Sequence, residues 1–482
     1  MDNRESFQSR LGFILISAGC AIGIGNVWKF PYMVGQNGGG MFVLFYLLFL
    51  ISVGVPIMTM EFAVGRASRK SSVQAFRILE PAGTRWHWSG YLGMAGNYIL
   101  MFFYTTVSGW MLYYFYLFCT GRFSAGMDGA AVSSVFSDML ASPGTMLFWM
   151  LLVVVMGIAV CSLGLENGVE RITKWMMLAL LVLIVILAVH CLTLPGAGAG
   201  LKFYLVPSLA RVREVGLFNV IVAAMNQSFF TLSIGIGSMA IFGSYLDKAH
   251  SLTGESIRIA ALDTFVAIVA GLIIFPACFS FGVEPGSGPG LVFITLPNVF
   301  NAMAGGRIWG ALFFLFLFFA ALSTVIAVFE NIIALGMDNF GWSRKKSSLL
   351  NFIVLAAGSI PCVLGFSLWA GFTPFGAGSN VLDLEDFLVS NLLLPGGSLV
   401  YLLFCVKKRG WGFENFLAET NIGKGIKMPR WVSLWLNYGL PLFFKYPPSS
   451  EIYALSLHDA LRIFPVCCRR AAFPAKQCRV KK

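Results

Sequence analysis

The sequence predicts an all-α polytopic membrane protein, and three observations favour this fold class. Of the 482 residues, 57% are hydrophobic and only 12% are charged, about half the charge of a soluble globular protein. About ten or eleven apolar runs approach the roughly 20 residues with which a helix spans a bilayer. Most Lys and Arg residues lie between these runs, as in the loops of a membrane protein. The composition therefore excludes a soluble enzyme, a disordered chain and a disulfide scaffold.

Ten spans and a weak eleventh are expected along the chain. Their ranges are 11–35, 40–65, 88–119, 144–163, 172–193, 218–244, 256–282, 304–337, 347–367 and 380–406, with the eleventh beginning near residue 431. The spans divide the chain into an N-terminal segment (1–10), a first five-helix repeat (11–193), an extracellular loop (194–217), a second five-helix repeat (218–406), and a cytoplasmic loop with a partial eleventh span (407–445).

The last segment, residues 446–482, differs from the rest of the chain. After Pro448 it reads SSEIYALSLHDALRIFPVCCRR, which closely resembles the translation of a sequencing adapter. We interpret this segment as a non-native tail. A divergent basic tail is the alternative.

The loop charges predict the orientation in the membrane. With the N-terminus inside, twenty Lys and Arg residues fall in the inner segments and five in the outer ones. Cytoplasmic loops of membrane proteins carry such an excess, so we expect a cytoplasmic N-terminus. The net charge of +12 then belongs to loops beside the lipid bilayer and to the tail, and no nucleic-acid partner is expected.

Two of the spans contain matching glycine-rich interruptions. The first span contains AIGIGN (21–26) and the sixth contains SIGIGS (233–238). Each Gly costs a helix about 1 kcal/mol relative to Ala, and unwound backbone at membrane depth needs protein or a wet cavity around it. Five spans separate the two stretches, so the two halves face opposite ways. An inverted repeat with broken first helices indicates the binding site of a secondary transporter; close helix packing is the alternative.

The residues around the first interruption carry a family resemblance. The run RLGFIL (10–15) followed by GIGNVWKFPYMVGQNGGG (23–40) resembles the neurotransmitter:sodium symporter family, bacterial branch, as do EFAVGR (61–66), FFTLS (229–233) and FFAALST (318–324). The likeness covers about residues 4–445 and is strongest to transporters of hydrophobic amino acids. It implies the leucine-transporter fold, with two inverted five-helix repeats and broken helices 1 and 6. It further implies sodium-driven import of neutral, mainly hydrophobic amino acids by alternating access across the bacterial cytoplasmic (inner) membrane, by a monomer or weak oligomer.

The resemblance implies two Na⁺ sites. The first uses the carbonyl of Ala21, the side chain of Asn26, the hydroxyl and carbonyl of Thr231, and Asp263, with the substrate carboxylate completing the shell. An ion pair between Asp263 and Arg258 is the alternative role for this carboxylate. The second site uses the carbonyls of Gly19, Ile22 and Ala320 and the hydroxyls of Ser323 and Thr324. Here the alternative is that both hydroxyls only bond back to their own helix.

The chloride pocket of animal relatives matches Tyr46, Gln227, Thr231, Asp263 and Ala267 in this sequence. Ala267 lacks a hydroxyl, and the Asp263 carboxylate would repel an anion. We therefore expect chloride-independent transport.

The resemblance also places the substrate between the two broken helices. Its carboxylate is expected at the N–H groups of Ile24 and Gly25 and the hydroxyl of Tyr104. Its ammonium group is expected at carbonyls of the two breaks and at Ser233. The complete expected set is Ala21, Ile24, Gly25, Leu100, Tyr104, Phe230, Thr231, Ser233, Ile236, Thr324 and Val328, with Phe230 as a lid and with Ile236 and Val328 setting the pocket length. Because no member is charged, an apolar side chain is favoured.

Two pairs of charged residues match the gates of the family. Lys29 and Asp386 match the outer pair, with Lys in place of the usual Arg, which alone can make a bidentate fork. Arg4 and Asp338 match the inner pair, beside Phe7 and Tyr245.

Other functions remain open at the level of the sequence. The chain could carry another small amine or osmolyte with sodium, or it could be a transporter-like amino-acid sensor that does not transport. A membrane enzyme is not expected, because Asp263 has no nearby His, Cys or Lys partner in the sequence.

Overall fold

The computed structural model describes residues 5–123, 127–282 and 290–445. Arg4 and the segment 446–482 therefore lie outside the described residues. Within the described ranges the regular structure is helical, apart from one isolated bridge between His250 and Lys424. The prediction of an all-α protein is confirmed.

The N-terminal half contains the first broken helix and four further helical spans. Its helices are α1 (Arg10–Ala21), η1 (Gly25–Lys29), α2 (Phe30–Gln36), α3 (Gly40–Phe49), η2 (Leu50–Gly54), α4 (Val55–Ser68), α5 (Ser72–Leu79), α6 (His87–Thr120), α7 (Gly129–Ala141), α8 (Pro143–Ser162), η3 (Leu165–Glu170) and α9 (Arg171–Leu192), where η marks a π-helical segment.

The C-terminal half contains the second broken helix and the segment that follows the tenth span. Its helices are α10 (Ala197–Leu205), α11 (Leu209–Val215), α12 (Leu217–Thr231), α13 (Ser238–Tyr245), α14 (Leu252–Ser280), η4 (Leu291–Thr295), α15 (Leu296–Ala302), α16 (Gly306–Phe340), α17 (Arg344–Leu364), α18 (Val381–Phe387), η5 (Leu388–Leu393), α19 (Leu394–Val406), α20 (Phe413–Thr420), α21 (Val432–Leu434), η6 (Trp435–Gly439) and α22 (Leu440–Lys445).

Seven continuous helices of the described residues are long and apolar enough to cross a membrane. The pair Arg10–Ala21 and Gly25–Gln36 passes the same test as one span bent by 53°. The 34-residue helix α6 is not among the seven, and the sixth predicted span is divided into α12 and α13, each too short to cross alone. Three helices within predicted spans, α6, α12 and α13, are therefore not among the seven continuous spans.

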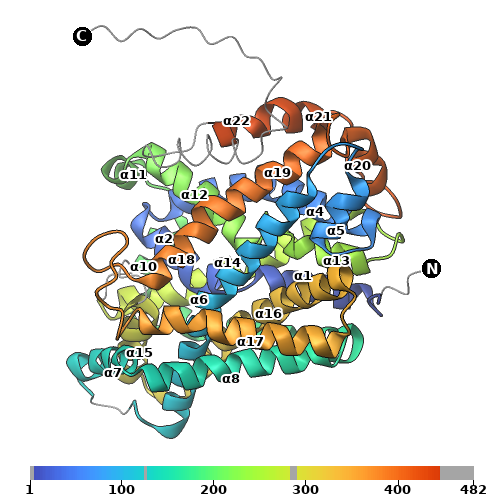
Figure 1. Cartoon of the computed structure of the whole chain (residues 1–482). Coiled ribbons are helices and arrows are strands. Elements are labelled where there is room, and N and C mark those ends of the chain that lie inside the picture. Colours follow the sequence, from blue (N-terminus) through green and yellow to red (C-terminus); the bar gives the residue numbers. More distant parts are fainter. Residues whose placement is uncertain (1–4, 124–126, 283–289, 446–482) are drawn as a thin grey trace, which may run out of the picture.

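The centre of the molecule is formed by α16, which packs most extensively against α6. Most of its residues from Phe313 to Gly336 are buried. Helices α8 and α17 lie side by side along one flank (Figure 1). Helix α16 also packs against α1 of the first broken helix and α13 of the second.

Five of the six π-helical segments have the same local cause. Each ends two residues before a proline, and the residue between them donates its N–H to the carbonyl five positions back. Proline has no N–H and its ring clashes with the carbonyl four residues earlier, so a wider turn relieves the clash. The prolines are Pro31, Pro56, Pro297, Pro395 and Pro441, and the donors are Phe30, Val55, Leu296, Leu394 and Leu440.

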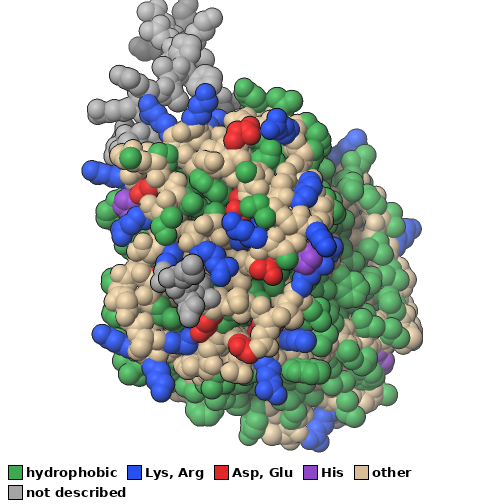
Figure 2. Space-filling model, turned by 90° about the vertical axis from the view of Figure 1, so that its right-hand side faces the viewer, with side chains coloured by type: hydrophobic (Ala, Val, Ile, Leu, Met, Phe, Trp, Pro, Cys, Tyr) green, Lys and Arg blue, Asp and Glu red, His purple; other side chains and the backbone are tan. Residues whose placement is uncertain are grey.

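Basic side chains gather on the face of the molecule that carries the described N-terminal end. Figure 2 views this face and shows Lys and Arg spread across it, with hydrophobic side chains along the flank. Near this face, the Glu170 carboxylate accepts hydrogen bonds from the N–H groups of Gln8 and Ser9. Arg10 pairs with Glu255 at 2.6 Å. These contacts hold residues 8–10 against η3 and α14.

Candidate functional site

The first break separates α1 from η1, and its geometry leaves carbonyl groups without helical partners. Ile22 leaves the helical conformation, with ψ of 100°. A Cβ on Gly23 would collide with the hydroxyls of Tyr104 and Thr324. Only glycine therefore allows the broken backbone to approach α6 and α16 this closely.

The second break, between α12 and α13, is held by an acidic side chain from another span. Ser233, Gly235 and Gly237 adopt positive φ values of 51°, 101° and 78°. The fully buried Glu61 of α4 accepts hydrogen bonds from the N–H groups of Gly235 at 2.5 Å and Met239 at 3.1 Å. These donors lie at and before the first turn of α13, where backbone N–H groups have no helical partner. Both predicted broken helices are confirmed.

Three of the four residues expected at the first sodium site, Asn26, Thr231 and Asp263, are in contact. Asn26 donates from Nδ2 to the Asp263 carboxylate at 2.8 Å, and the Thr231 hydroxyl donates to its other oxygen at 3.1 Å. Asp263 is fully buried in α14. In the described residues no cation pairs with it, and Arg258 pairs with Glu255 instead, at 2.8 Å. The alternative of an Arg258–Asp263 ion pair is therefore wrong.

The residues expected at the second sodium site also converge, between α1 and α16. The Ser323 hydroxyl donates to the Ile22 carbonyl at 3.3 Å, and the Thr324 hydroxyl lies 3.2 Å from the Gly19 carbonyl. Both hydroxyls also reach the Ala320 carbonyl of their own helix, at 2.9 and 3.5 Å. The bond back to the helix and the approach to the first break therefore exist together. The five groups form a compact cluster of neutral oxygen atoms.

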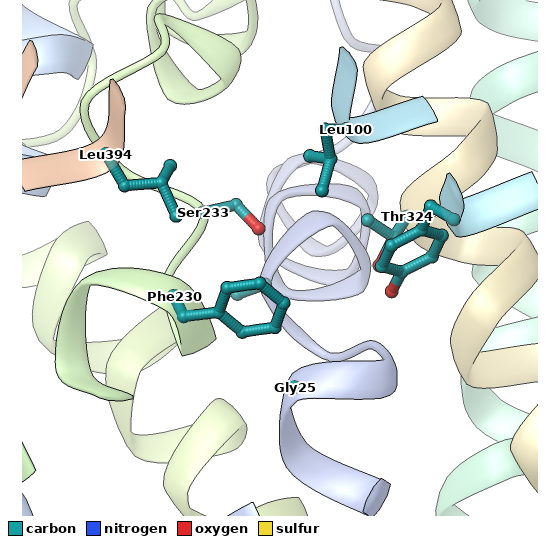
Figure 3. Close-up of a pocket in the computed structure, with 8 residues that line it drawn as sticks. Gly25, Leu100, Phe230, Ser233, Thr324 and Leu394 are labelled. Carbon is teal, nitrogen blue, oxygen red and sulfur yellow. The ribbon is translucent and has the colours of Figure 1, made fainter. Parts of the chain in front are cut away.

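A cavity lies between the two breaks and the central helices. It is lined by Ala21, Gly25, Leu100, Tyr104, Phe230, Ser233, Thr324 and Leu394. Seven of these eight residues were expected from the sequence. Figure 3 shows Leu100 and Thr324 on one side of the cavity, with Leu394, Ser233 and Phe230 on the other. The lining contains hydroxyl groups but no charged side chain.

The other four residues of the expected substrate set do not line this cavity in the described structure. Ile24 donates its N–H to the Tyr104 hydroxyl at 2.8 Å, and Thr231 faces Asp263. Ile236 is buried, and its carbonyl accepts a hydrogen bond from Asn97. Val328 is buried within α16. That Ile236 and Val328 set the length of the pocket for a bound substrate stays a prediction.

Two functional neighbours escaped the sequence reasoning. Leu394 completes the cavity lining, and Glu61 holds the second break. The signals were present: LPGG (394–397) interrupts the apolar tenth span, and a lone carboxylate stands inside the second. An acidic residue within a span is a functional candidate by default.

The two residues predicted to form the outer gate are in contact with each other. Lys29 Nζ lies 2.9 and 3.0 Å from the two carboxylate oxygens of Asp386 and 2.9 Å from the Ser390 hydroxyl. The same ammonium group lies 4.0 Å from the centre of the Phe230 ring, within cation–π range. The charged pair and the lid are therefore in direct contact.

The residues predicted for the inner gate make aromatic and polar contacts. Phe7 packs edge-on against Tyr245 at 5.8 Å, and the Tyr245 hydroxyl donates to Glu330 at 2.8 Å. Asp338 accepts the Ser71 N–H at 2.7 Å, while its expected partner Arg4 lies outside the described residues. Both groups of residues predicted to form gates thus make contacts in the described structure, apart from Arg4.

The model of the sodium:neurotransmitter symporter family matches residues 4–126 and 130–444. The chain belongs to this family. Among symporters of the family, the uncharacterized sodium-dependent transporter YhdH of Bacillus subtilis (strain 168) is 35% identical over 398 residues, which cover 83% of this chain and 86% of YhdH. An uncharacterized sodium-dependent transporter of Haemophilus influenzae is 31% identical over 447 residues, covering 90% and 94% of the two chains.

A solved symporter structure matches the whole architecture. The crystal structure of MhsT in complex with L-phenylalanine superposes with a TM-score of 0.81 at 35% identity, covering 96% of this chain and 100% of MhsT. The predicted leucine-transporter fold is confirmed. The chain is thus a sodium-dependent transporter of the symporter family and not an enzyme.

Proposed function

We propose that this symporter imports neutral, mainly hydrophobic amino acids. The observation that carries the proposal is a cavity without charged side chains, bordered by broken backbone. Leu100, Phe230 and Leu394 offer apolar contact, while Tyr104 and Ser233 offer hydroxyl groups. An acidic or basic cargo side chain would be buried without a partner, at a cost of several kcal/mol. The L-phenylalanine bound by MhsT supports an amino acid as cargo.

The zwitterionic part of the cargo would meet the two breaks. The Gly25 backbone at the start of η1 and the Tyr104 hydroxyl are suited to a carboxylate, because helix N-termini present free N–H groups and a positive dipole end. The Ser233 hydroxyl, which now donates to the Cys20 carbonyl at 3.0 Å, lies where an ammonium group would be received.

The proposal places one Na⁺ between Ala21, Asn26, Thr231 and Asp263. A fully buried carboxylate without a cationic partner among the described residues is strongly unfavourable unless a cation joins it. Its neighbours offer carbonyl, amide and hydroxyl oxygen, the hard donors that small metal ions prefer. The cargo carboxylate beside this Na⁺ would couple ion binding to cargo binding.

A second Na⁺ is proposed among the carbonyls of Gly19, Ile22 and Ala320 and the hydroxyls of Ser323 and Thr324. All five donors are neutral, so this ion would be held more weakly than the one beside Asp263. It would join the first broken helix to α16. Loss of this ion to the low sodium concentration inside a cell would then release α1 and open the inner side.

Chloride independence follows from the same carboxylate. Tyr46 contacts Thr231 at 3.5 Å and Gln227 binds the Gly25 carbonyl at 3.0 Å, so neighbours of the chloride pocket of animal relatives are present. Asp263 already supplies the negative charge at this place, and Ala267 offers no hydroxyl. An added anion would be repelled.

We place the protein in the bacterial cytoplasmic membrane with its N-terminus inside, as a monomer or weak oligomer. The basic face in Figure 2, which carries the described N-terminal end, supports this orientation through the positive-inside rule. The apolar flank beside that face suits contact with lipid.

The test is uptake by the purified protein in sealed proteoliposomes under an inward sodium gradient. Radiolabelled leucine, phenylalanine, alanine, glutamate and lysine are offered with sodium chloride, sodium gluconate or potassium chloride outside. We expect accumulation of the neutral amino acids in both sodium salts and none in potassium. Sodium-dependent binding without accumulation would indicate a sensor, and a requirement for chloride would contradict the anion-free mechanism.

A further inference from the structure

Asn97 is a fully buried polar residue of α6 that faces the second break. Its amide nitrogen donates hydrogen bonds to the carbonyls of Gly93 and Ile236, both at 2.8 Å. Its amide oxygen accepts hydrogen bonds from the Ser238 hydroxyl at 3.0 Å and from the Asn331 amide at 3.3 Å. One side chain thus joins α6 to the second break and to α16.

The two contacts with the break lie where the chain turns from the unwound segment into α13. Ile236 stands between Gly235 and Gly237, whose φ values are 101° and 78°. Ser238, which follows them, is the first residue of α13. By binding Ile236 and Ser238 together, Asn97 holds the end of the unwound segment and the beginning of the helix to one point on α6.

The backbone of α6 lies directly against this turn. A Cβ on Gly93 would be 3.2 Å from the Ile236 carbonyl oxygen, and a Cβ on Gly96 would be 2.9 Å from the Ile236 side chain. Glycine at these two positions therefore allows α6 to approach the break closely. Asn97 follows Gly96 in the sequence, so its short amide side chain can reach the Ile236 carbonyl.

Other helices hold the break through different groups. Glu61 of α4 accepts the Gly235 N–H. A Cβ on Gly235 would collide with the Leu394 carbonyl, and a Cβ on Gly397 would collide with the Gly235 carbonyl. A carboxylate can only accept hydrogen bonds, whereas an amide can also donate them. Glu61 thus binds N–H groups of the break, and Asn97 binds a carbonyl group of the break.

We propose that Asn97 is a positioning residue, which holds the second break in its cargo-binding shape by donating to the Ile236 carbonyl. Phe230 and Ser233, which line the cavity, precede Ile236 on the same segment. Without the amide donor, the Ile236 carbonyl would turn away from α6, and the Ser233 hydroxyl would move from the place proposed for the cargo ammonium group. The inference rests on the proposed function and deepens it.

The test measures the KM and the maximal rate of sodium-driven leucine uptake by the full chain in proteoliposomes. Asn97→Leu keeps a side chain of similar size but removes the donor. Its KM for leucine should rise about tenfold, which corresponds to the loss of one buried hydrogen-bond partner. The maximal rate should change less, because saturating cargo restores the shape of the break.

Asn97→Asp separates hydrogen-bond donation from packing. A carboxylate at this position would repel the carbonyl oxygens of Gly93 and Ile236, whereas a protonated carboxyl group can donate to one of them. Burial and acid both favour the protonated form, so the KM of Asn97→Asp relative to the unmodified protein should fall as the pH is lowered from about 8 to about 5.5. Titration of Glu61 and Asp263 occurs in both proteins and cancels in this ratio.

Asn351→Leu and Asn351→Asp are the matched controls. Asn351 of α17 is also buried and also binds α6, by accepting a hydrogen bond from the Tyr98 hydroxyl at 2.6 Å. Its amide nitrogen donates to the Ser347 carbonyl of its own helix at 2.9 Å. Since these contacts join α6 to α17 and not to the break, both variants should keep the leucine KM of the unmodified protein.

The outcomes separate this inference from the proposed function. An unchanged KM in Asn97→Leu, or an Asn97→Asp protein whose relative KM does not respond to pH, would overturn the inference while leaving sodium-driven uptake intact. An equal rise of KM in the Asn351 variants would also overturn it, because the effect would then come from general loosening of α6. If Asn97→Leu does not fold, Asn97→Ser, which can still donate through its hydroxyl, should show a smaller rise. If the unmodified protein takes up no amino acid with sodium, the proposed function fails, and this inference fails with it.

Discussion

Asp263 combines full burial with neutral partners, and this combination determines its chemistry. Its carboxylate is hydrogen-bonded to Asn26 and Thr231, both of which are uncharged. Hydrogen bonds alone offset only part of the cost of removing a carboxylate from water. We therefore expect a small cation to bind reversibly beside Asp263.

Replacing Asp263 tests this demand directly. Asp263→Ala should abolish sodium-dependent leucine uptake, because the cation loses its only charged ligand among the described residues. Asp263→Asn should retain some uptake but require a higher sodium concentration, since the amide keeps an oxygen ligand without the charge. The measurement is initial uptake rate against external sodium. Unchanged sodium dependence in both variants would remove this residue from the ion site.

Lys29 acts at the outer gate through a single ammonium group with four contacts. It joins Asp386, Ser390 and the ring of Phe230. In Lys29→Ala we expect at least a tenfold loss of leucine uptake, while sodium-dependent leucine binding persists, because the lid can no longer be held closed over the cargo. Parallel uptake and equilibrium binding measurements check this. Lys202→Ala, an exposed position on α10, is the control and should behave as the unmodified protein. Full uptake in Lys29→Ala would show that closure does not need this pair.

At the scale of elements, α13 depends on a side chain from α4 for its beginning. Glu61 accepts two backbone N–H groups, at Gly235 and Met239, that the break leaves without helical partners. This acceptor is what allows a polar break to persist inside the bundle.

Removal of Glu61 should therefore lower stability. Each buried donor left without an acceptor costs about 1–3 kcal/mol, so Glu61→Ala should reduce the thermal unfolding midpoint in detergent by several degrees. The unfolding midpoint of Glu61→Gln, which keeps an acceptor oxygen, should lie between those of Glu61→Ala and the unmodified protein. Glu214→Ala, on the exposed side of α11, is the control. Equal midpoints for all four proteins would mean that water replaces the carboxylate without cost.

The elements differed in how far the sequence could predict them. The two broken helices followed from glycine density, since Gly23 and Gly235 are needed for close backbone approach whatever surrounds them. The π-helical turns did not, although proline explains five of them, because a proline within a span can also produce a kink. Leu394 was missed because its contact with the break joins segments about 160 residues apart, and hydrophobic periodicity carries no information on such pairs.

The residues of the site also differed in how far the sequence could predict them. Oxygen-bearing residues at both breaks could be chosen from the motifs, but the placement of Ser323 and Thr324 against α1 depended on the family resemblance. Ile236 and Val328, which were expected to set the pocket length, are not among the residues that line the cavity, whereas Leu394 of the tenth span is.

At the scale of the whole molecule, the residues just before α1 are held by hydrogen bonds and ion pairs to several helices. Glu170 receives three hydrogen bonds from residues 8 and 9, and Arg344 joins Glu5 to Glu330 at 2.8 and 2.7 Å. These contacts connect the start of α1 to helices of both repeats. The proposed opening of the inner side would have to break these contacts.

Releasing one of these contacts should shift the molecule toward an inward-open state. In Glu170→Ala, residues 8 and 9 lose their acceptor, so a cysteine introduced at Ser17, which is buried in α1, should be labelled by a water-soluble maleimide several-fold faster than in the parent protein. Glu166→Ala, an exposed neighbour in η3, should not change the labelling rate. Equal rates in Glu170→Ala and the parent would mean that this carboxylate does not hold the inner side closed.

The backbone contact between Gly235 and Gly397 has a consequence for how cargo escapes. Each glycine lies against main-chain oxygen from the opposite segment, and neither has room for another carbon. Such a junction transmits tilt in full, since there is no flexible side chain between the segments to absorb it. We therefore expect Asp386, in the tenth span, and Phe230, in the sixth, to move together. Cargo should then leave toward the outside only when both residues have moved away from the cavity.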